Sequence, residues 1–289
     1  MYKTFDSILN RVNEPIAVQA PLLQKYGMEG IGMTRAMMED MKVAREADKI
    51  IKDHGLKWNC MHPPIDPLSE ETSDEQFDDL LETLKRWSEI CEKIGIRYSY
   101  NRIWSGSNYR NFDENFEWNV LRVRQIQNVV SQYGINYGLE WIGPEKVKKS
   151  FKYPFLNTLS GVLAIADAAA PNIGFIFDCY HWWCSGGKID DLYYAAQHID
   201  RLQTLHINDA APKPREEQED KVRAMPLTTG AIDAALPYTI LKRAGFTGPL
   251  VCEPFMPTVD RFETMTAEEV IREIAEATDR VINAVPGAF

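Results

Sequence analysis

The chain lacks the features that mark membrane, secreted and nucleotide-binding proteins. Among its 289 residues no apolar run approaches the ~18 residues that a membrane helix needs. No apolar stretch of a secretory signal follows residues 1–6, and no G-x-G-x-x-G or Walker sequence is present to hold a phosphate. The five cysteines are odd in number and scattered, which does not suit a disulfide framework. We therefore expect a reduced, cytoplasmic protein with no membrane contact.

The chain also lacks a dense block of lysine and arginine. Its formal net charge is −10, so we do not expect nucleic acid as a partner. An acidic balance is compatible with a site for a divalent cation, although solvated surface carboxylates account for most of it. The chain has only five histidines, of which His54 and His198 fall in expected helices. A two-metal phosphoesterase would need more of them, so that activity is disfavoured.

The apolar pattern alternates between strand and helix about eight times, with no change of composition that would mark a domain boundary. Such alternation predicts parallel strands joined by helices, and eight units in this length predict one (β/α)8 TIM barrel of the α/β class over residues 1–289. A doubly wound open sheet is the alternative, but it would want a phosphate loop after the first strand. Strands are expected over 1–5, 29–33, 56–62, 96–103, 137–140, 175–178, 202–206 and 250–253. Helices are expected over 15–26, 37–54, 73–95, 116–133, 156–170, 190–199, 232–244 and 266–285, with capping-box spacing at Ser73/Gln76 and Thr266/Glu269.

Four of the expected strands end in side chains that can bind a metal. They run into Glu140, Asp178, His206 and Glu253. The C-terminal ends of barrel strands form one shared rim, so these four groups converge there. Three carboxylates and an imidazole at close range repel one another unless a cation lies among them. Oxygen donors with one nitrogen favour Mn²⁺, with Mg²⁺, Co²⁺ or Zn²⁺ as alternatives.

Further residues near these strand ends are candidates to line a substrate site. Indole faces pack on the apolar faces of sugar rings, and imidazoles hydrogen-bond hydroxyls. The tryptophans could instead be core residues that do not contact substrate. Glu145 could instead belong to a charged loop over 145–149. Lys213 and Arg215 could instead be ordinary exposed loop residues. The candidates are His62, Trp104, His181, Trp182, Trp183, Glu145, Lys213 and Arg215.

Three short motifs in this order resemble one known family. They are Phe177-Asp178-x-x-His181-Trp182, His206-Ile207-Asn208-Asp209-Ala210 and Glu253-Pro254-Phe255, with Glu140 at the right distance upstream. Together they are similar to the sugar phosphate isomerases and epimerases of the xylose isomerase-like TIM barrels, which include the ketose 3-epimerases. The chain departs from many members at Pro212, where they carry an arginine, and at 226–230, where they carry a Pro-Gly-x-Gly turn.

The resemblance implies one divalent ion held by Glu140, Asp178, His206 and Glu253, with Glu140 and Glu253 also acting as acid and base. A metal on a carbonyl and its neighbouring hydroxyl acidifies the C–H between them and stabilises a cis-enediolate. His181 would then donate a hydrogen bond to the substrate oxygen whose negative charge grows.

The function expected from these observations is a metal-dependent isomerase or epimerase of a small carbohydrate, phosphorylated or not. A lyase or dehydratase on a keto-sugar or keto-polyol such as an inosose would use the same metal and base. A carbohydrate-binding barrel with an inert site is the alternative that is not an enzyme. A homodimer or homotetramer is considered, because exposed aromatics at the barrel mouth favour an assembly that covers the loops.

Overall fold

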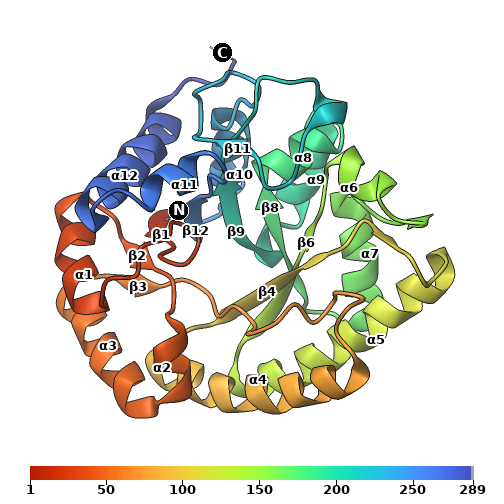
Figure 1. Ribbon diagram of the computed structural model, residues 1–289, viewed down its shortest axis with the longest axis horizontal. Helices are drawn as coiled ribbons and strands as arrows, with labels where there is room; N and C mark the ends of the chain where they lie inside the picture. The colour runs from red at the N-terminus through yellow and green to blue at the C-terminus, as the bar shows by residue number, and fades with distance from the viewer. Residues whose placement is uncertain (288–289) are drawn as a thin grey trace.

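The computed structural model describes residues 1–287 and shows the predicted (β/α)8 barrel. Within these residues the main sheet has eight strands, each parallel to its neighbours, in the order β3-β2-β1-β12-β9-β8-β6-β4. Figure 1 looks down the barrel, with helices around the outside. The barrel strands are β1 (Tyr2–Phe5), β2 (Gly30–Ile31), β3 (Lys57–Trp58), β4 (Tyr98–Ile103), β6 (Asn136–Trp141), β8 (Gly174–Asp178), β9 (Leu202–Ile207) and β12 (Pro249–Cys252).

The barrel closes between the two strands at the ends of this order. Met61, just beyond β3, forms a parallel bridge with Ser99 of β4, and the Met61 amide donates to the Tyr98 carbonyl at 2.8 Å. No helix in the described part of the chain is long and apolar enough to cross a membrane. The helices are α1 (Ile16–Lys25), α2 (Arg35–Glu39), α3 (Met41–Asp53), α4 (Asp74–Ile94), α5 (Phe112–Val130), α6 (Glu145–Lys149), α7 (Leu159–Ala169), α8 (Cys179–Cys184), α9 (Ile189–Gln197), α10 (Ala235–Arg243), α11 (Thr258–Phe262) and α12 (Ala267–Asn283).

Local signals place the starts of the long helices α4 and α12 correctly. The predicted capping boxes of Ser73 with Gln76 and of Thr266 with Glu269 are both formed, at the starts of α4 and α12. Helix α4 ends where Gly95 takes a left-handed conformation, with φ of 93°. Since each helix buries the face that carries its apolar residues, the pattern in the sequence fixes which side packs on the barrel.

Several expected elements differ in the structure. The helix expected over 37–54 is two helices, because Asp40 is extended, with φ of −140°, and caps α3 through the Lys42 amide. Residues 145–149, interpreted as a charged loop, form α6. Helix α5 begins four residues earlier than expected, because Asn111 and Glu114 form a capping box that the sequence reading missed. Asp178 caps the short helix α8, which was not predicted.

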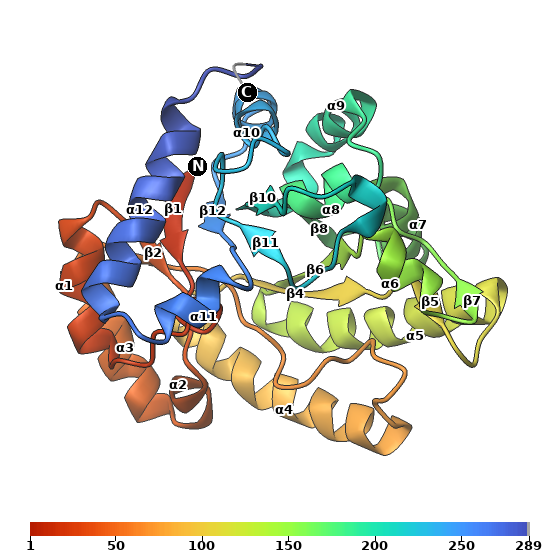
Figure 2. The same cartoon turned by 45° about the horizontal axis from the view of Figure 1, so that its top comes forward.

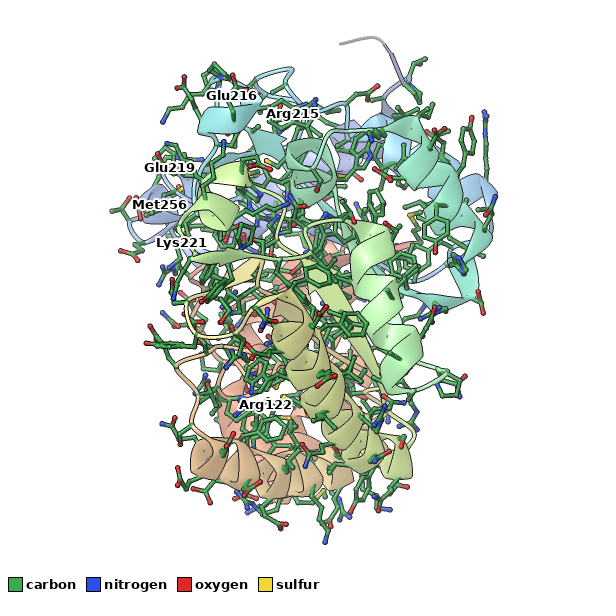
Figure 3. The ribbon with its side chains drawn as sticks, turned by 90° about the vertical axis from the view of Figure 1, so that its right-hand side faces the viewer. Arg122, Arg215, Glu216, Glu219, Lys221 and Met256 are labelled. Carbon is green, nitrogen blue, oxygen red and sulfur yellow. The ribbon has the colours of Figure 1, made fainter. Side chains whose placement is uncertain are left out.

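The segment expected to be a long polar loop over 209–229 contains an antiparallel hairpin, β10 (Asp209–Ala210) with β11 (Arg223–Ala224). It follows β9 directly and lies over the C-terminal end of the barrel, as Figure 2 shows. In the side view of Figure 3, Glu219 and Lys221 of this segment lie at the same end as Met256. The hairpin is therefore part of the barrel mouth.

One buried carboxylate holds this segment in place. Asp209 Oδ1 accepts hydrogen bonds from the amides of Ala210 and Ile232, at 2.8 and 2.9 Å. Its Oδ2 accepts from the amides of residues 228, 229 and 230, at 2.9 to 3.1 Å. In the turn at 226–230, Leu227 takes the left-handed conformation, with φ of 58°.

The main apolar core lies between the strands and the surrounding helices. A second, small apolar cluster of Cys60, Tyr100 and Ile176 lies apart from it. The buried polar residues include a group from the C-terminal strand ends and the hairpin, which burial normally disfavours unless they are paired. This group consists of Glu140, Asp178, His181, His206, Asn208, Arg223 and Glu253.

Candidate metal centre and active site

The four predicted metal ligands meet at the barrel mouth. Glu140 lies in β6, Asp178 ends β8, His206 lies in β9 and Glu253 follows β12, and these four strands are consecutive neighbours in the sheet. Asp178 and His206 are paired in register across their two strands. All four side chains are almost completely buried. The sequence pattern therefore brought together residues that lie up to 113 positions apart in the chain.

The candidate donor atoms form two overlapping groups in which all atoms lie within 4.8 Å of one another: Asp178, His206 and Glu253, and Glu140, Asp178 and His181. His206 Nδ1 lies 3.4 Å from Glu140 Oε1, 3.4 Å from Glu253 Oε2 and 3.8 Å from Asp178 Oδ2. Ligands about 2.1 Å from one ion in a tetrahedral arrangement lie about 3.4 Å apart, so these spacings suit a shared cation. Glu140 Oε1 and His206 Nδ1 are buried with no hydrogen-bond partner among the described residues. Two unpartnered atoms facing the same point are what a metal site leaves when only the protein is considered.

Tyr100 orients the imidazole ligand. Its hydroxyl lies 3.3 Å from His206 Nε2, the ring nitrogen that faces away from the carboxylates. If Nε2 carries the proton and donates to Tyr100, Nδ1 keeps its lone pair for a cation. Burial lowers the pKa of His206, but the Glu253, Asp178 and Glu140 carboxylates raise it well above its usual value. Metal binding at Nδ1 therefore competes with a proton.

Arg223 is a site residue that the sequence reading missed. Its Nη1 donates to Asp178 Oδ2 at 2.7 Å and to Glu253 Oε2 at 2.5 Å. Its Nη2 donates to Asp220 Oδ1 at 2.9 Å and lies 3.1 Å from His181 Nε2. Burial opposes ionisation of Asp178, but Arg223 and the neighbouring imidazoles hold its pKa well below the usual range.

The arginine enters from the hairpin, 17 positions beyond His206, and not from the position of Pro212. Arg223 thus supplies a buried guanidinium, although the position at which many family members carry an arginine is Pro212 in this chain. The four carboxylates around His206 and Arg223, Asp220 included, exceed the guanidinium by three negative charges, which favours a bound cation. An arginine in a long polar segment gives no local signal of burial, and only the β10–β11 pairing reveals it.

The hydrogen bonds around His181 restrict which of its ring nitrogens carries the proton. Its Nδ1 accepts a hydrogen bond from the Gly143 amide at 3.1 Å, so the ring proton belongs on Nε2. Arg223 Nη2 also faces Nε2 and can only donate. A neutral imidazole cannot accept at both nitrogens, so two donors point at one another beside the metal ligands. An oxygen atom that accepts from both would satisfy them.

His62 lies in a pair with a residue that the sequence reading did not single out. Asp6, at the end of β1, accepts from His62 Nε2 at 3.1 Å and from the amides of Ile8 and Leu9. The His62 ring packs edge-on against Tyr100, with ring centroids 5.2 Å apart. The pair therefore adjoins Tyr100, whose hydroxyl contacts the candidate ligand His206.

The Asp6–His62 pair predicts a pH-dependent stability. Burial lowers the pKa of His62, but Cys60 and Asp6 raise it well above its usual value, whereas hydrogen bonds from His62 lower the pKa of Asp6 against the effect of burial. The His62 contribution is complete below the unfolded pKa of about 6.5 and is lost as pH rises through the folded pKa; that of Asp6 is present above about 4 and is lost on acidification. We expect Asp6→Asn to reduce the unfolding free energy by about 2–3 kcal/mol, most strongly between about pH 4 and 6.5.

Urea denaturation of both proteins across pH 4–9 measures this difference. The control is Asp78→Asn, an exposed aspartate on α4 that should leave the curve within about 0.5 kcal/mol of wild type. A stability difference for Asp6→Asn that stays constant up to pH 9 would show that the pair does not titrate as described.

The other predicted substrate residues lie in different surroundings. Trp104 is half-buried, and its Nε1 donates to Asp66 Oδ2 at 3.0 Å. Trp182 is buried against the core, and its Nε1 donates to the Lys188 carbonyl at 2.9 Å. Glu145, on α6, lies 3.7 Å from Lys149. Trp104 faces the loops of the barrel mouth, whereas the Trp182 indole packs in the core.

The two predicted basic loop residues do not join the metal cluster. Arg215 donates to the Gly186 carbonyl at 2.8 Å, and its guanidinium stacks on Trp183 with 4.8 Å between the guanidinium carbon and the ring centroid. Lys213 is exposed. A substrate role for either residue stays a prediction, and the buried arginine of the site is Arg223.

Comparison with known proteins shows the family to which the fold belongs. An inosose isomerase of Bacillus licheniformis is 25% identical over 96% of this chain and 97% of its own. The solved structure of an IolI protein with a bound zinc atom has a TM-score of 0.79 at 20% identity, covering 98% of each chain. That of a D-psicose 3-epimerase from Clostridium cellulolyticum H10 has a TM-score of 0.71 at 14% identity, again covering 98% of each. The model of the xylose isomerase-like TIM barrel matches residues 21–281, and the chain therefore belongs to that family.

Proposed function

We propose that the protein is a divalent-metal-dependent isomerase or epimerase of a small carbohydrate or keto-polyol. Glu140, Asp178, His206 and Glu253 would hold the ion, with Mn²⁺ preferred. The convergent donor atoms and their two unpartnered members support this proposal. So do the relatives, which include proteins named inosose isomerase and D-psicose 3-epimerase.

The ion would act as a Lewis acid that makes the carbon-bound hydrogen next to a carbonyl acidic. Glu140 and Glu253 would then move the proton. They lie on β6 and β12, with β8 and β9 between them, so they approach a bound molecule from two sides. One carboxylate can remove a proton and the other can return it to the opposite face, which is an epimerisation. Return to the adjacent carbon is an aldose–ketose isomerisation.

The observation that carries the proposal furthest is the contact between His181 and Arg223. Arg223 Nη2 gives one hydrogen to Asp220, but His181 Nε2, 3.1 Å from Nη2, has no acceptor within hydrogen-bond distance among the described residues, since Asp220 Oδ1 is 3.7 Å away. A substrate oxygen beside the metal ligands would accept from both, and its affinity for them would grow as it gains negative charge during proton removal. This explains why an imidazole with Nδ1 occupied by Gly143 is placed next to a guanidinium.

Exchange of substrate hydrogen with D₂O tests the proposal. Ketoses, their phosphates and inososes are incubated with Mn²⁺-loaded protein and examined by mass spectrometry. We expect a product of unchanged composition that carries one deuterium on carbon when the proton equilibrates with solvent, together with a new epimer or isomer on chromatography. Loss of a water mass would instead identify a dehydratase. No exchange and no product with any of these compounds would contradict the proposal.

A further inference from the structure

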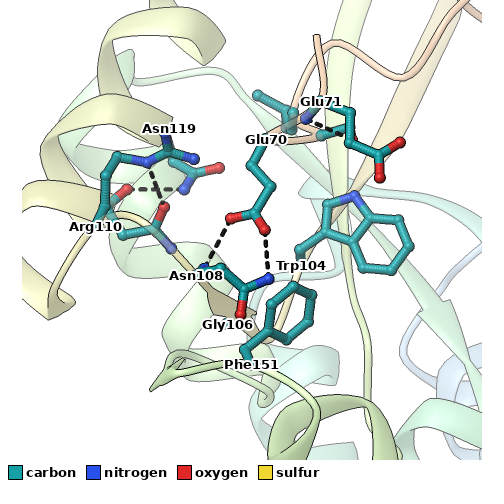
Figure 4. Close-up of a pocket in the computed structure, with 11 residues that line it drawn as sticks. Glu70, Glu71, Trp104, Gly106, Asn108, Arg110, Asn119 and Phe151 are labelled. Atoms are coloured by element: carbon teal, nitrogen blue, oxygen red, sulfur yellow. Dashed lines mark hydrogen bonds between the residues drawn. The ribbon is translucent and has the colours of Figure 1, made fainter.

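A cavity of 230 Å³ lies at the barrel mouth, outside the metal centre. Its lining comes from three loops, which follow the C-terminal ends of β3, β4 and β6, and from Asn115 and Asn119 of α5. Figure 4 shows its principal walls. The side chains that matter are Glu70, Trp104, Asn108, Arg110, Asn119 and Phe151.

The cavity is within reach of a molecule bound at the metal centre. Arg102 of β4 is paired in register with the metal ligand Glu140 of β6, and Trp104 follows two residues later. Neighbouring strands are about 4.8 Å apart and two residues rise about 6.6 Å, so the Cα atoms of Trp104 and Glu140 lie roughly 8 Å apart. That separation is about the length of one sugar ring and its linkage. Trp104 is thus a wall of the cavity immediately above the strand that borders the metal site.

The walls combine flat apolar surfaces with fixed acceptors. The rings of Trp104 and Phe151 lie edge-on, with centroids 6.2 Å apart. Glu70 accepts from the Asn108 amide at 2.9 Å, from its Nδ2 at 2.7 Å and from Ser107 Oγ at 2.8 Å. Burial acts to raise the pKa of Glu70, but these hydrogen bonds lower it below its usual value, so the carboxylate stays ionised. A carboxylate held in this way can accept from hydroxyl groups and repels anions.

Two polar side chains in the cavity wall have hydrogen-bonding atoms without a partner among the described residues. Asn119 is 3% exposed, and its Oδ1 has no hydrogen-bond partner in the described part of the chain. Arg110 donates through Nε to Asn115 and stacks on Trp118, with 3.9 Å between guanidinium carbon and ring centroid, while its Nη groups make no hydrogen bond within residues 1–287. A buried acceptor and guanidinium donors without partners in the lining favour a ligand that has hydroxyl groups.

We propose that this cavity is a second subsite, which binds the uncharged second ring of a two-ring carbohydrate whose first ring lies at the metal centre. The inference rests on the proposed function and makes its substrate more specific. At about 30 Å³ per water, the volume holds roughly eight waters, which suits one ring and not a longer chain. Glu70 and Glu71 outweigh Arg110 by one negative charge, so a phosphate group is disfavoured. The aromatic pair supplies the apolar surface on which a sugar face packs.

Calorimetric titration of the Mn²⁺-loaded protein with D-fructose, isomaltulose and methyl α-D-glucopyranoside tests the subsite. Isomaltulose joins a glucosyl ring to a ketose that keeps its carbonyl. We expect it to bind at least about tenfold more tightly than fructose. In Phe151→Ala and Asn119→Leu that advantage should fall to about twofold or less, with fructose affinity unchanged. Tyr109→Ala, an exposed residue near the cavity, should keep the full advantage.

The test separates this inference from the proposed function. Equal affinity for fructose and isomaltulose, an advantage that survives in both variants, or no binding of any of the three probes would overturn the subsite. The exchange experiment in D₂O would still decide the reaction at the metal centre. Circular dichroism of each variant, and the glucoside titration on His206→Ala, show whether a loss is local: the glucoside should bind that variant as it binds wild type.

Discussion

Substitution of His206 by alanine is expected to release the divalent ion and to reduce turnover at least about 10³-fold. His206 Nδ1 is the nitrogen on which the three carboxylate oxygens converge, at 3.4 to 3.8 Å. Without the imidazole, the site loses its nitrogen ligand, while the carboxylates still repel one another. Glu253→Gln should weaken metal binding less, because the amide oxygen can still ligate. It should nevertheless lower the rate by a similar factor, because an amide cannot exchange a proton.

Metal analysis of purified protein after dialysis against Mn²⁺, together with initial rates on the substrate found by deuterium exchange, measures both effects. His198→Ala is the matched control, since His198 follows α9 and packs on Tyr194 away from the cluster. It should keep about one ion per chain and the wild-type rate. If His206→Ala also keeps the ion and its rate, the donor set described here is not the metal site.

Replacement of Arg223 by glutamine is expected to affect both stability and activity. Arg223 is 3% exposed and contacts Asp178, Glu253 and Asp220. Removal of one partner of a buried ion pair typically costs about 3–5 kcal/mol, because the remaining charges stay buried and uncompensated. We expect a loss of about 3 kcal/mol in unfolding free energy without added metal, and a smaller loss with Mn²⁺, which supplies positive charge. We also expect kcat/KM to fall about 10²–10³-fold, since a donor to the substrate oxygen is gone.

Urea denaturation with EDTA and with Mn²⁺, beside kinetics on the identified substrate, separates the two consequences. Arg223→Lys keeps the charge but not the planar fork, so it should recover most of the stability and little of the rate. Lys221→Gln, on the same segment and exposed, should change neither. A glutamine variant as stable with EDTA as wild type would show that the guanidinium does not compensate the buried carboxylates.

The sequence by itself determined the barrel and the place of the four candidate metal ligands at its rim. Periodic apolar residues and capping boxes are local signals, so the alternation of strands and helices could be read directly. Parallel strands of a barrel all end at one rim, and therefore a polar residue at the end of each strand has a predictable place. Glu140, Asp178, His206 and Glu253 were found for this reason. The helical periodicity of apolar residues gave a wrong prediction where one side chain ends a helix and caps the next. Asp40 does this within an apparently continuous helix.

Only the tertiary structure decided which other groups face the site. Arg223 lies in a polar segment whose β10–β11 pairing and Asp209 anchor are long-range hydrogen bonds that no local pattern encodes. Asp6 and His62 are 56 residues apart, and the cavity beside Trp104 is formed by loops after three different strands. Such groups meet because the barrel closes and brings its loops together. The pattern of strands in the sequence predicts the position of a residue along the barrel. Its contacts across the barrel mouth depend instead on the conformations of the loops.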